Sequence, residues 1–326
     1  MIYLHMDKRY KTDQWYRRFQ YLLDQMGAAR KNINLLRTDF RRLAVEPHDA
    51  LIGRFAHNRR DLHRIRPIFR ELAENFSGRI FPSEITYRYY DNKQLQLEFL
   101  TEHAFPTPRG AYVASRSDVE AFLNRTGLKL PLVSKRLFGA SSSQVILANR
   151  LDEVLFPGVV QEYCRNNDGD LRIVVIGNRV MGFFRRNRPN DFRASGSGLI
   201  EYVEELEPAC VRIAYDISSQ MGFDSMAYDF VRDNQGRWVV LECSYTYIAA
   251  AVRDCRYYYE MPSGHRRDKQ GVYPQDFILE DFLAKYPTAI DGHTKKSFWM
   301  QTAGWLSRRT GLDSRETEDG ALVEST

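Results

Sequence analysis

Apolar residues recur with two different periods along the first eighty residues, and this alternation predicts a small α/β domain. Short apolar runs typical of buried strands occur at residues 1–6, 32–38 and 49–56. Helical spacing of apolar side chains, ending near Gly27 and Gly78, occurs in residues 13–27 and 63–78. Because strand and helix alternate, we expect parallel strands in a domain over residues 1–80, which ends before Pro82.

The rest of the chain shows a pattern of short strands, hairpins and a few helices. Helices are predicted for residues 91–105, 117–127 and 210–222, and the second begins with the capping pattern Ser-x-x-Glu. Strands are predicted for residues 107–113 and 159–164, and on both sides of a small-residue loop within 130–148. Two hairpins are predicted, one over residues 170–186 turning at Gly177–Asn178, the other over 223–246 turning at 233–236. We divide this region into 81–165, 166–260, and a C-terminal helical extension with a flexible tail at 261–326.

Composition indicates a globular protein and limits the kinds of partner that we expect for it. Of the 326 residues, 43% are hydrophobic, and no run of eighteen apolar residues occurs, so we expect no membrane span. There is no signal-peptide pattern, and the four cysteines show no metal-binding spacing, so reduced thiols in the cytoplasm are expected. Basic residues crowd the first seventy positions, which raises nucleic acid as a partner. Their helical spacing favours solvated helix faces, so we expect no nucleic acid, and we leave a homodimer open.

Two acids lie across the second predicted hairpin from each other. Asp229 precedes the turn, and Glu242 follows thirteen positions later (242 − 229). If the turn lies near residues 234–235, the alternation of strand faces brings the two carboxylates opposite each other. Like charges placed in this way repel unless a cation lies between them, and Mg²⁺ prefers carboxylate and phosphate oxygens. Two solvated acids are the alternative, but the apolar setting of "WVVLECS" favours a metal site.

Three further segments carry side chains suited to a phosphate-bearing ligand. Lys135 precedes a loop of small residues, 139–143, whose N–H groups and hydroxyls can cover phosphates. The strand that ends in "QEY", residues 161–163, is suited to a nucleobase. The arginine- and glycine-rich stretch 187–202 is either a solvated loop or an anion site. Each of these signals is weak by itself.

The order of these elements is far more specific, and it resembles the ATP-grasp superfamily, in pattern most of all the ribosomal-protein glutamate ligase branch. In chain order the elements are "DNK", "SKRLFGASSSQV", "VVQEY", "DLRIVVIGNRVMGFFRR" with "NDFRASGSG", and "YDFV" with "LECS". The resemblance runs from about residue 80 to residue 250. It implies an α/β (α+β) fold, with a small parallel α/β pre-ATP-grasp domain before a two-subdomain ATP-grasp module. The chain is also similar to ATP-grasp proteins often encoded among surface-polysaccharide genes.

The resemblance implies nucleotide-binding roles for a first set of residues, with ATP as cofactor. Lys93 and Lys135 match lysines that contact the phosphates. The phosphate-covering loop is matched by Gly139, Ser141, Ser142 and Ser143. The hinge that receives adenine is matched by Gln161, Glu162 and Tyr163, and Asp170 lies where an acid often faces the ribose.

The resemblance also implies residues for the substrate and for one or two Mg²⁺ ions. Arg185 and Arg193 match arginines near the γ-phosphate and the acyl substrate, whereas substrate-facing positions are taken by Arg172, Ser195 and Ser197. The metal ligands are matched by Asp229, Glu242 and Ser244. The family usually has asparagine where this chain has Ser244, whose hydroxyl has a shorter reach, and asparagine is also common at the position of Ser195.

The activity that the resemblance implies is ATP-dependent ligation of a carboxylate to an amine through an acylphosphate, with release of ADP and phosphate. A small-molecule or glycan-linked acid, such as an acidic sugar or an amino acid, is the expected substrate class. Two alternatives stay open at this point. One is a kinase that transfers the γ-phosphate to a small molecule, and the other is a nucleotide-binding protein without turnover.

Overall fold

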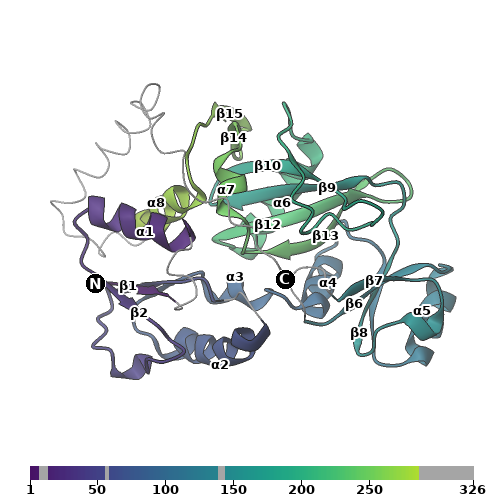
Figure 1. Ribbon diagram of the computed structural model, residues 1–326, viewed down its shortest axis with the longest axis horizontal. Helices are drawn as coiled ribbons and strands as arrows, with labels where there is room; N and C mark the ends of the chain where they lie inside the picture. Colours follow the sequence, from purple (N-terminus) through teal and green to yellow (C-terminus); the bar gives the residue numbers. More distant parts are fainter. Residues whose placement is uncertain (7–13, 56–58, 139–143, 286–326) are drawn as a thin grey trace. The chain divides into compact units, whose positions relative to one another are not determined.

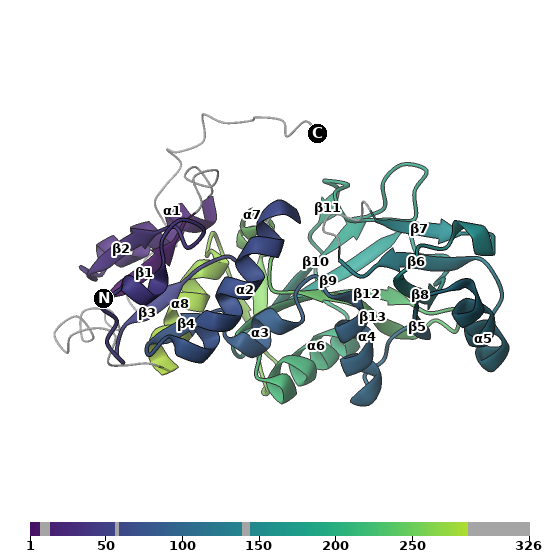
Figure 2. The same cartoon turned by 90° about the horizontal axis from the view of Figure 1, so that it is seen from below.

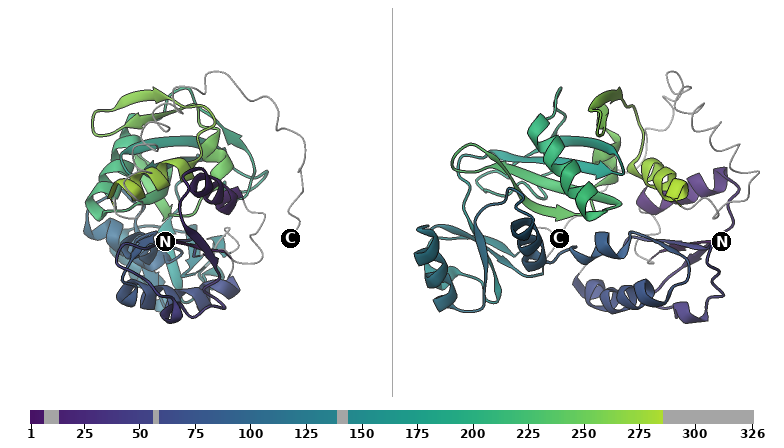
Figure 3. Two further views of the ribbon diagram at one scale, coloured as in Figure 1. Left: turned by 90° about the vertical axis from the view of Figure 1, so that its left-hand side faces the viewer. Right: turned by 180° about the vertical axis from the view of Figure 1, so that it is seen from behind.

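A four-stranded parallel sheet forms the N-terminal part of the protein (Figure 1). Its strands are β1 (Ile2–His5), β2 (Arg30–Ile33), β3 (Ala50–Ile52) and β4 (Arg79–Phe81), in the order β2-β1-β3-β4. Helices α1 (Gln14–Gln25) and α2 (Arg59–Asn75) cover opposite faces of this sheet (Figures 1 and 3). Strands β1 and β3 are buried throughout, as expected for the centre of a sheet covered on both faces. The predicted parallel α/β arrangement is confirmed, and β4 adds a strand that the sequence pattern did not reveal.

The computed structural model describes residues 1–6, 14–55, 59–138 and 144–285. The chain divides into two units, Met1–Ala289 and Ile290–Thr326, and the second lies outside the described residues. The predicted phosphate-covering residues Gly139, Ser141, Ser142 and Ser143 also lie outside them. Within the described ranges, none of the helices combines the length and apolar character that a transmembrane span requires.

A second sheet, entirely antiparallel, follows the parallel one along the chain. It consists of β5 (Gly110–Val113), β6 (Leu132–Arg136), β7 (Val145–Ala148) and β8 (Gly158–Glu162), in the order β5-β8-β6-β7. Helices α4 (Lys93–Glu102) and α5 (Arg116–Thr126) both pack against β5. The cap of α5 is Ser115, two residues before the predicted Ser117, because the Asp118 carboxylate accepts a hydrogen bond from the Ser115 backbone N–H at 2.9 Å.

The largest sheet carries both predicted hairpins. Its strands are β9 (Gly169–Ile176), β10 (Arg179–Arg186), β12 (Ser225–Arg232), β13 (Trp238–Ser244), β14 (Tyr257–Glu260) and β15 (His265–Asp268), in the order β13-β12-β9-β10-β14-β15. A short strand, β11 (Ile200–Glu201), pairs with β10. Helix α6 (Pro208–Met221) packs against β9, β10 and β12 (Figure 2). The turns at Gly177–Asn178 and at residues 233–236 are confirmed.

Three further α-helices and one aromatic cluster belong to this unit. The helices are α3 (Glu84–Arg88), α7 (Ala249–Arg253) and α8 (Pro274–Lys285), and α8 packs against both α1 and α7. The aromatic cluster joins the parallel sheet to the region of the largest sheet. In it, the Tyr245 hydroxyl accepts a hydrogen bond from the Phe55 backbone N–H at 2.9 Å, and the Tyr90 and Tyr245 rings meet edge to face at 5.0 Å.

Candidate active site

One face of the largest sheet carries a row of charged side chains. Asp229 on β12 pairs directly with Glu242 on β13 and with Arg172 on β9, and Arg185 on β10 pairs with Asp170 on β9. Because side chains two residues apart on a strand share a face, Asp170 and Arg172 point to the same side. The predicted juxtaposition of the two hairpin acids is therefore present, but two arginines and a third acid lie beside them.

Ion pairs, rather than like-charge repulsion, dominate around Asp229. Arg172 donates to both carboxylate oxygens of Asp229, at 2.7 and 2.8 Å. Arg185 donates to both oxygens of Asp170, at 2.7 and 2.6 Å, and its Nη2 also lies 2.8 Å from Asp229. The expected cation beside these acids is provided at Asp229 by the guanidiniums of Arg172 and Arg185, and a metal ion in addition stays a prediction.

These contacts shift the pKa values of the two aspartates in opposite directions. Burial raises the pKa of Asp229, but the charges and hydrogen bonds of Arg172 and Arg185 outweigh it, and the net pKa lies well below its usual range. For Asp170, burial and the nearby charge of Asp229 raise the pKa to about 6, because together they outweigh the attraction of Arg185. Asp229 is therefore held as a carboxylate anion, the form that a metal ligand requires.

Glu242 is held by a lysine from a distant part of the chain. The Lys93 ammonium donates a hydrogen bond to Glu242, and the Asp91 carboxylate lies 3.8 Å from the same ammonium. Burial lowers the pKa of Lys93, but the two carboxylates outweigh that effect and the net pKa is raised. Lys93 begins α4, where Asn92 caps the helix by accepting a hydrogen bond from the Leu95 N–H at 3.2 Å. The helix N-terminus therefore fixes where this ammonium lies.

Lys135 has the same low exposure as Lys93, 7%, but no comparable partner. Its ammonium donates to the Leu241 carbonyl at 3.5 Å and forms no ion pair with the described residues. That carbonyl is presented by a bulge, since Asp229 pairs with Glu242 whereas the next residue, Phe230, pairs with Val240. Burial lowers the pKa of Lys135 to about 8, against the partial compensation of Glu242. The two lysines thus differ in their charge partners and not in their burial.

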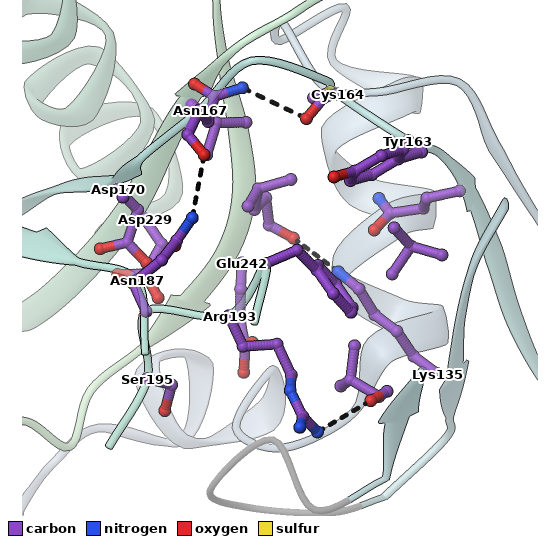
Figure 4. Close-up of a pocket in the computed structure, with 18 of the residues that line it drawn as sticks. Lys135, Tyr163, Cys164, Asn167, Asp170, Asn187, Arg193, Ser195, Asp229 and Glu242 are labelled. Atoms are coloured by element: carbon purple, nitrogen blue, oxygen red, sulfur yellow. Dashed lines mark hydrogen bonds between the residues drawn. The ribbon is translucent and has the colours of Figure 1, made fainter. Parts of the chain in front are cut away.

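A pocket lies between the antiparallel four-stranded sheet and the charged face of the largest sheet. Nine of the residues predicted for the site line it: Lys135, Gln161, Glu162, Tyr163, Asp170, Arg193, Ser195, Asp229 and Glu242. In Figure 4, Lys135 and Tyr163 lie on one side, with Asp170, Asp229 and Asn187 on the other. Of the predicted residues that the structure describes, five do not line it: Lys93, Arg172, Arg185, Ser197 and Ser244.

The pocket also has walls that the sequence-based prediction did not include. Its apolar lining includes Val133, Val145, Phe192, Val231 and Leu241, and its polar lining includes Asn167 and Asn187. Two of these residues could have been predicted from the alternation of strand faces, because Val133 lies two residues before Lys135 and Val231 two residues after Asp229. An apolar slot that ends in charged groups suits a ligand with a flat apolar ring and an anionic tail.

The predicted hinge residues have different surroundings. The Glu162 carboxylate accepts hydrogen bonds from Arg109 at 2.8 Å and from the Asn234 side chain at 2.9 Å, so both of its oxygens have partners in the protein. Tyr163 packs edge to face against Phe192 with 5.9 Å between the ring centroids. Gln161 is buried, and its Oε1 has no hydrogen-bond partner in the described part of the chain. Gln161 is therefore the residue of this triplet with a polar atom left for a ligand.

The arginine- and glycine-rich stretch is braced by its own hydrogen bonds. Arg188 donates to the Ser195 carbonyl, with Nε at 2.8 Å. Arg193 donates to both carboxylate oxygens of Asp191, and its Nη1 reaches the Val145 carbonyl on β7 at 3.1 Å. Gly196 has a φ of 74°, the left-handed region that favours glycine, and a Cβ there would lie 2.9 Å from the Arg188 guanidinium. Arg193 also lines the pocket, and its expected role beside a substrate stays a prediction.

Two serines predicted for ligand binding also have local partners. The Ser244 hydroxyl, the expected third metal ligand, lies 3.0 Å from the Thr246 carbonyl and accepts from the Thr246 N–H at 3.2 Å. The Ser197 hydroxyl accepts from the Leu199 N–H at 3.2 Å. Both hydroxyls therefore shape turns in the chain.

Two carboxylates in this arrangement suit magnesium bound together with a nucleotide. Mg²⁺ keeps several waters and is usually held by one or two carboxylates together with substrate phosphates. Asp229 and Glu242 can supply those carboxylates from adjacent strands. No group of three or more His, Cys, Asp or Glu side chains suited to a metal ion occurs among the described residues, so the protein offers there no complete cage.

Comparison with known proteins gives a family for this segment. Residues 90–246 match the family described as RimK-like ATP-grasp domain. A probable alpha-L-glutamate ligase of Methanococcoides burtonii is 30% identical over 165 residues, covering 46% of this chain and 54% of that protein. The chain spans about half or less of the length of the curated relatives that it matches.

Solved structures share the fold over a larger part of the chain. A RimK domain protein of Sphaerobacter thermophilus superposes with a TM-score of 0.55 at 16% identity, covering 77% of this chain and 93% of that chain. The ATP-grasp ligase PsnB, solved with a minimal precursor, Mg and ADP, gives a TM-score of 0.52 at 16% identity, covering 76% and 89%. At such identities the likeness is one of fold. With the sequence match over residues 90–246, it shows that this chain contains a RimK-like ATP-grasp domain.

Proposed function

We propose that the protein is an ATP-dependent carboxylate–amine ligase that forms an amide bond through an acylphosphate. The observation that supports this most is the charge arrangement at one end of the pocket. Asp229 and Glu242 lie opposite each other, Lys93 donates to Glu242, and Lys135 lies close enough to be affected by its charge. Carboxylates and ammonium groups gathered in this way suit the phosphate end of a magnesium-bound nucleotide.

The proposed reaction has two steps. A carboxylate oxygen of the acid attacks the γ-phosphorus of ATP, the bond to the β-phosphate oxygen breaks, and ADP leaves. The amine nitrogen then attacks the carbonyl carbon of the acylphosphate, phosphate leaves, and the nitrogen loses a proton. Because the protein forms no covalent bond in either step, positioning and charge neutralisation supply the catalysis.

Individual side chains have distinct tasks in this proposal. Lys93 and Lys135 bind phosphate oxygens, and Gln161 contributes its spare amide oxygen to the base. Asp229 and Glu242 hold Mg²⁺, which when bound neutralises charge on the transferring phosphoryl group. Burial raises the pKa of the Cys164 thiol to about 12, so this pocket residue stays protonated and is no nucleophile.

The substrates are proposed only as classes. The curated relatives are named glutamate ligases, so glutamate is the first amine and the first acid to test. Acidic peptides and the uronic acids found in surface polysaccharides complete the panel. Because ATP is consumed, we place the reaction in the cytoplasm.

The test is product analysis with hydroxylamine as a surrogate amine. The enzyme is incubated with Mg-ATP and each acid of the panel, and products are identified by mass. A ligase gives ADP, phosphate and a hydroxamate of the correct acid, because the acylphosphate is an electrophile. Glu242→Gln should lose all three products, whereas Asp152→Asn, which changes an exposed acid paired with Arg150, should keep them.

Other products would replace this proposal with a named alternative. ADP together with a stable phosphorylated acceptor, and no hydroxamate, would establish a kinase. AMP and pyrophosphate would contradict transfer of the γ-phosphoryl group altogether. Binding of ATP without any ADP release across the panel would indicate a protein without turnover.

A further inference from the structure

The two carboxylates proposed to hold magnesium are both already paired with cations of the same chain. Asp229 lies between Arg172 and Arg185, and Glu242 accepts a hydrogen bond from Lys93. These cations are not surface charges, since the side chain of Lys93 is only 6% exposed and that of Arg185 11%. A divalent cation that approaches this pair of acids therefore meets fixed positive charge.

Lys93 is the cation whose position conflicts most directly with a metal. Its ammonium occupies Oε1 of Glu242, one of the two carboxylate oxygens that could become metal ligands. Its backbone is held at the first residue of α4, and its N–H donates to the Leu137 carbonyl at 3.1 Å. Asp91 adds a second carboxylate at 3.8 Å from the same ammonium. The lysine is thus fixed over Glu242 by both its backbone and its charge partners.

Removing this ammonium from Glu242 requires another anion. A buried charge that loses its partner strongly destabilises the protein. A nucleotide phosphate provides a replacement anion next to both lysines. A divalent cation alone does not, because it would displace the ammonium and leave it buried with Asp91 as its remaining partner. Binding of the cation and binding of the phosphate are then coupled.

We propose that Lys93 is a placeholder that keeps Glu242 closed to divalent cations until a nucleotide phosphate takes over its ammonium group. This inference rests on the proposed metal-binding role of Asp229 and Glu242. It fixes an order, in which the nucleotide phosphate opens the site for the metal. The proposal assigns this role to Lys93 and not to Lys135, because Lys135 donates to the Leu241 carbonyl and to neither acid.

The test measures binding of Mn²⁺ to the full-length protein by calorimetry and by the electron paramagnetic resonance signal of free Mn²⁺. For the wild type we expect affinity for Mn²⁺ that rises roughly tenfold or more when ADP is present. For Lys93→Met we expect binding of Mn²⁺ without nucleotide, and a coupling to ADP that is largely lost. Lys93→Gln is a second variant that keeps a polar group, and circular dichroism checks that both variants fold.

Lys269→Met is the matched control, because it removes another buried ammonium, which donates to the Val252 and Arg253 carbonyls and leaves the pair between Lys93 and Glu242 intact. It should behave like the wild type toward Mn²⁺ alone. A wild type that binds Mn²⁺ equally well with and without ADP would overturn the proposal, as would folded Lys93 variants that bind no Mn²⁺. Adding Glu242→Gln to Lys93→Met should abolish binding, and persistence would place the metal elsewhere. Nucleotide-free Mn²⁺ binding by Lys93→Met without any ligase product would keep the placeholder and reject only the proposed function.

Discussion

Replacing Lys135 by methionine should stabilise the protein while it impairs nucleotide binding. The lysine is 7% exposed, and burial lowers its pKa from the ordinary value of 10.5 to about 8. Each tenfold change in proton affinity corresponds to about 1.4 kcal/mol. The protonated ammonium therefore costs the folded state about 3 kcal/mol relative to the unfolded chain. Methionine has a similar length and no charge, so Lys135→Met should recover about 2–3 kcal/mol at neutral pH.

The pH dependence of this gain has a definite sign. Between pH 8 and 10.5 the unfolded chain keeps the Lys135 proton whereas the folded protein has lost it. The unfolded state then binds more protons, so this group makes the wild type more stable as the pH rises through that interval. The cost of the lysine is fully present below about pH 8 and is lost above 10.5. The advantage of Lys135→Met should therefore shrink from neutral pH to about pH 10.

The assay is urea unfolding of both proteins at neutral pH and near pH 10, together with the shift of melting temperature caused by Mg-ATP. Other titrating groups are shared by the two proteins, so the difference between them isolates Lys135. We expect a more stable variant that ATP no longer stabilises. A variant that is less stable than the wild type at neutral pH, or a difference that does not fall with pH, would refute the reasoning about the buried ammonium.

Three further substitutions test other contacts. Asp229→Asn should destabilise the protein by roughly 3 kcal/mol in urea unfolding, because it leaves two buried guanidiniums undercompensated, and unchanged stability would contradict the ion-pair assignment. Arg66→Met should raise the KM for ATP about tenfold with a smaller effect on kcat, because the Arg66 guanidinium donates to the Tyr90 and Asp91 carbonyls and so positions Lys93. A kcat that falls by as large a factor as KM rises would argue against this positioning role. Asn234→Ala should weaken the binding of a fluorescent ATP analogue severalfold, because it removes the hydrogen bonds that the Asn234 side chain donates to Glu162 and to the Tyr163 carbonyl. Unaltered binding would show that this contact does not support the site of the base.

The turn of the hairpin that carries Asp229 and Glu242 could be predicted because it is a local property, indicated by Asn234 and Gly236. The bulge could not: counting from the turn places Asp229 opposite Leu241, and only the register shift at Leu241 brings Glu242 opposite Asp229. The partners of these acids could not be predicted in the same way. Lys93 is 149 residues from Glu242, and Arg172 reaches Asp229 only because β12 pairs with β9, which is not its neighbour in sequence. Such pairings depend on strand order, which the hydrophobic pattern leaves open.

Other differences arise where an element is too short to show a period. Strand β4 has only three residues, too few to show the alternation of apolar and polar positions that predicts a strand. The run from Arg253 to Tyr273 has many aromatic and basic residues, and we read no strand from it. It contains the edge hairpin β14–β15, in which the Arg266 guanidinium lies 3.8 Å from the Tyr257 ring centroid.

The stretch from residue 187 to 202 shows how such an ambiguity can be decided. Arginine and glycine together fit either an anion site or a loop that braces itself, and composition does not separate the two. The distinguishing residue is Asp191, which lies two positions before Arg193 and accepts hydrogen bonds from its Nε and Nη2. An acid that close in sequence competes with an external anion, because the two side chains meet at a small cost in chain entropy. Lys93 pairs with an acid that is far away in sequence, and Lys135 donates to a carbonyl. We therefore expect these two lysines, rather than Arg193, to bind an incoming phosphate.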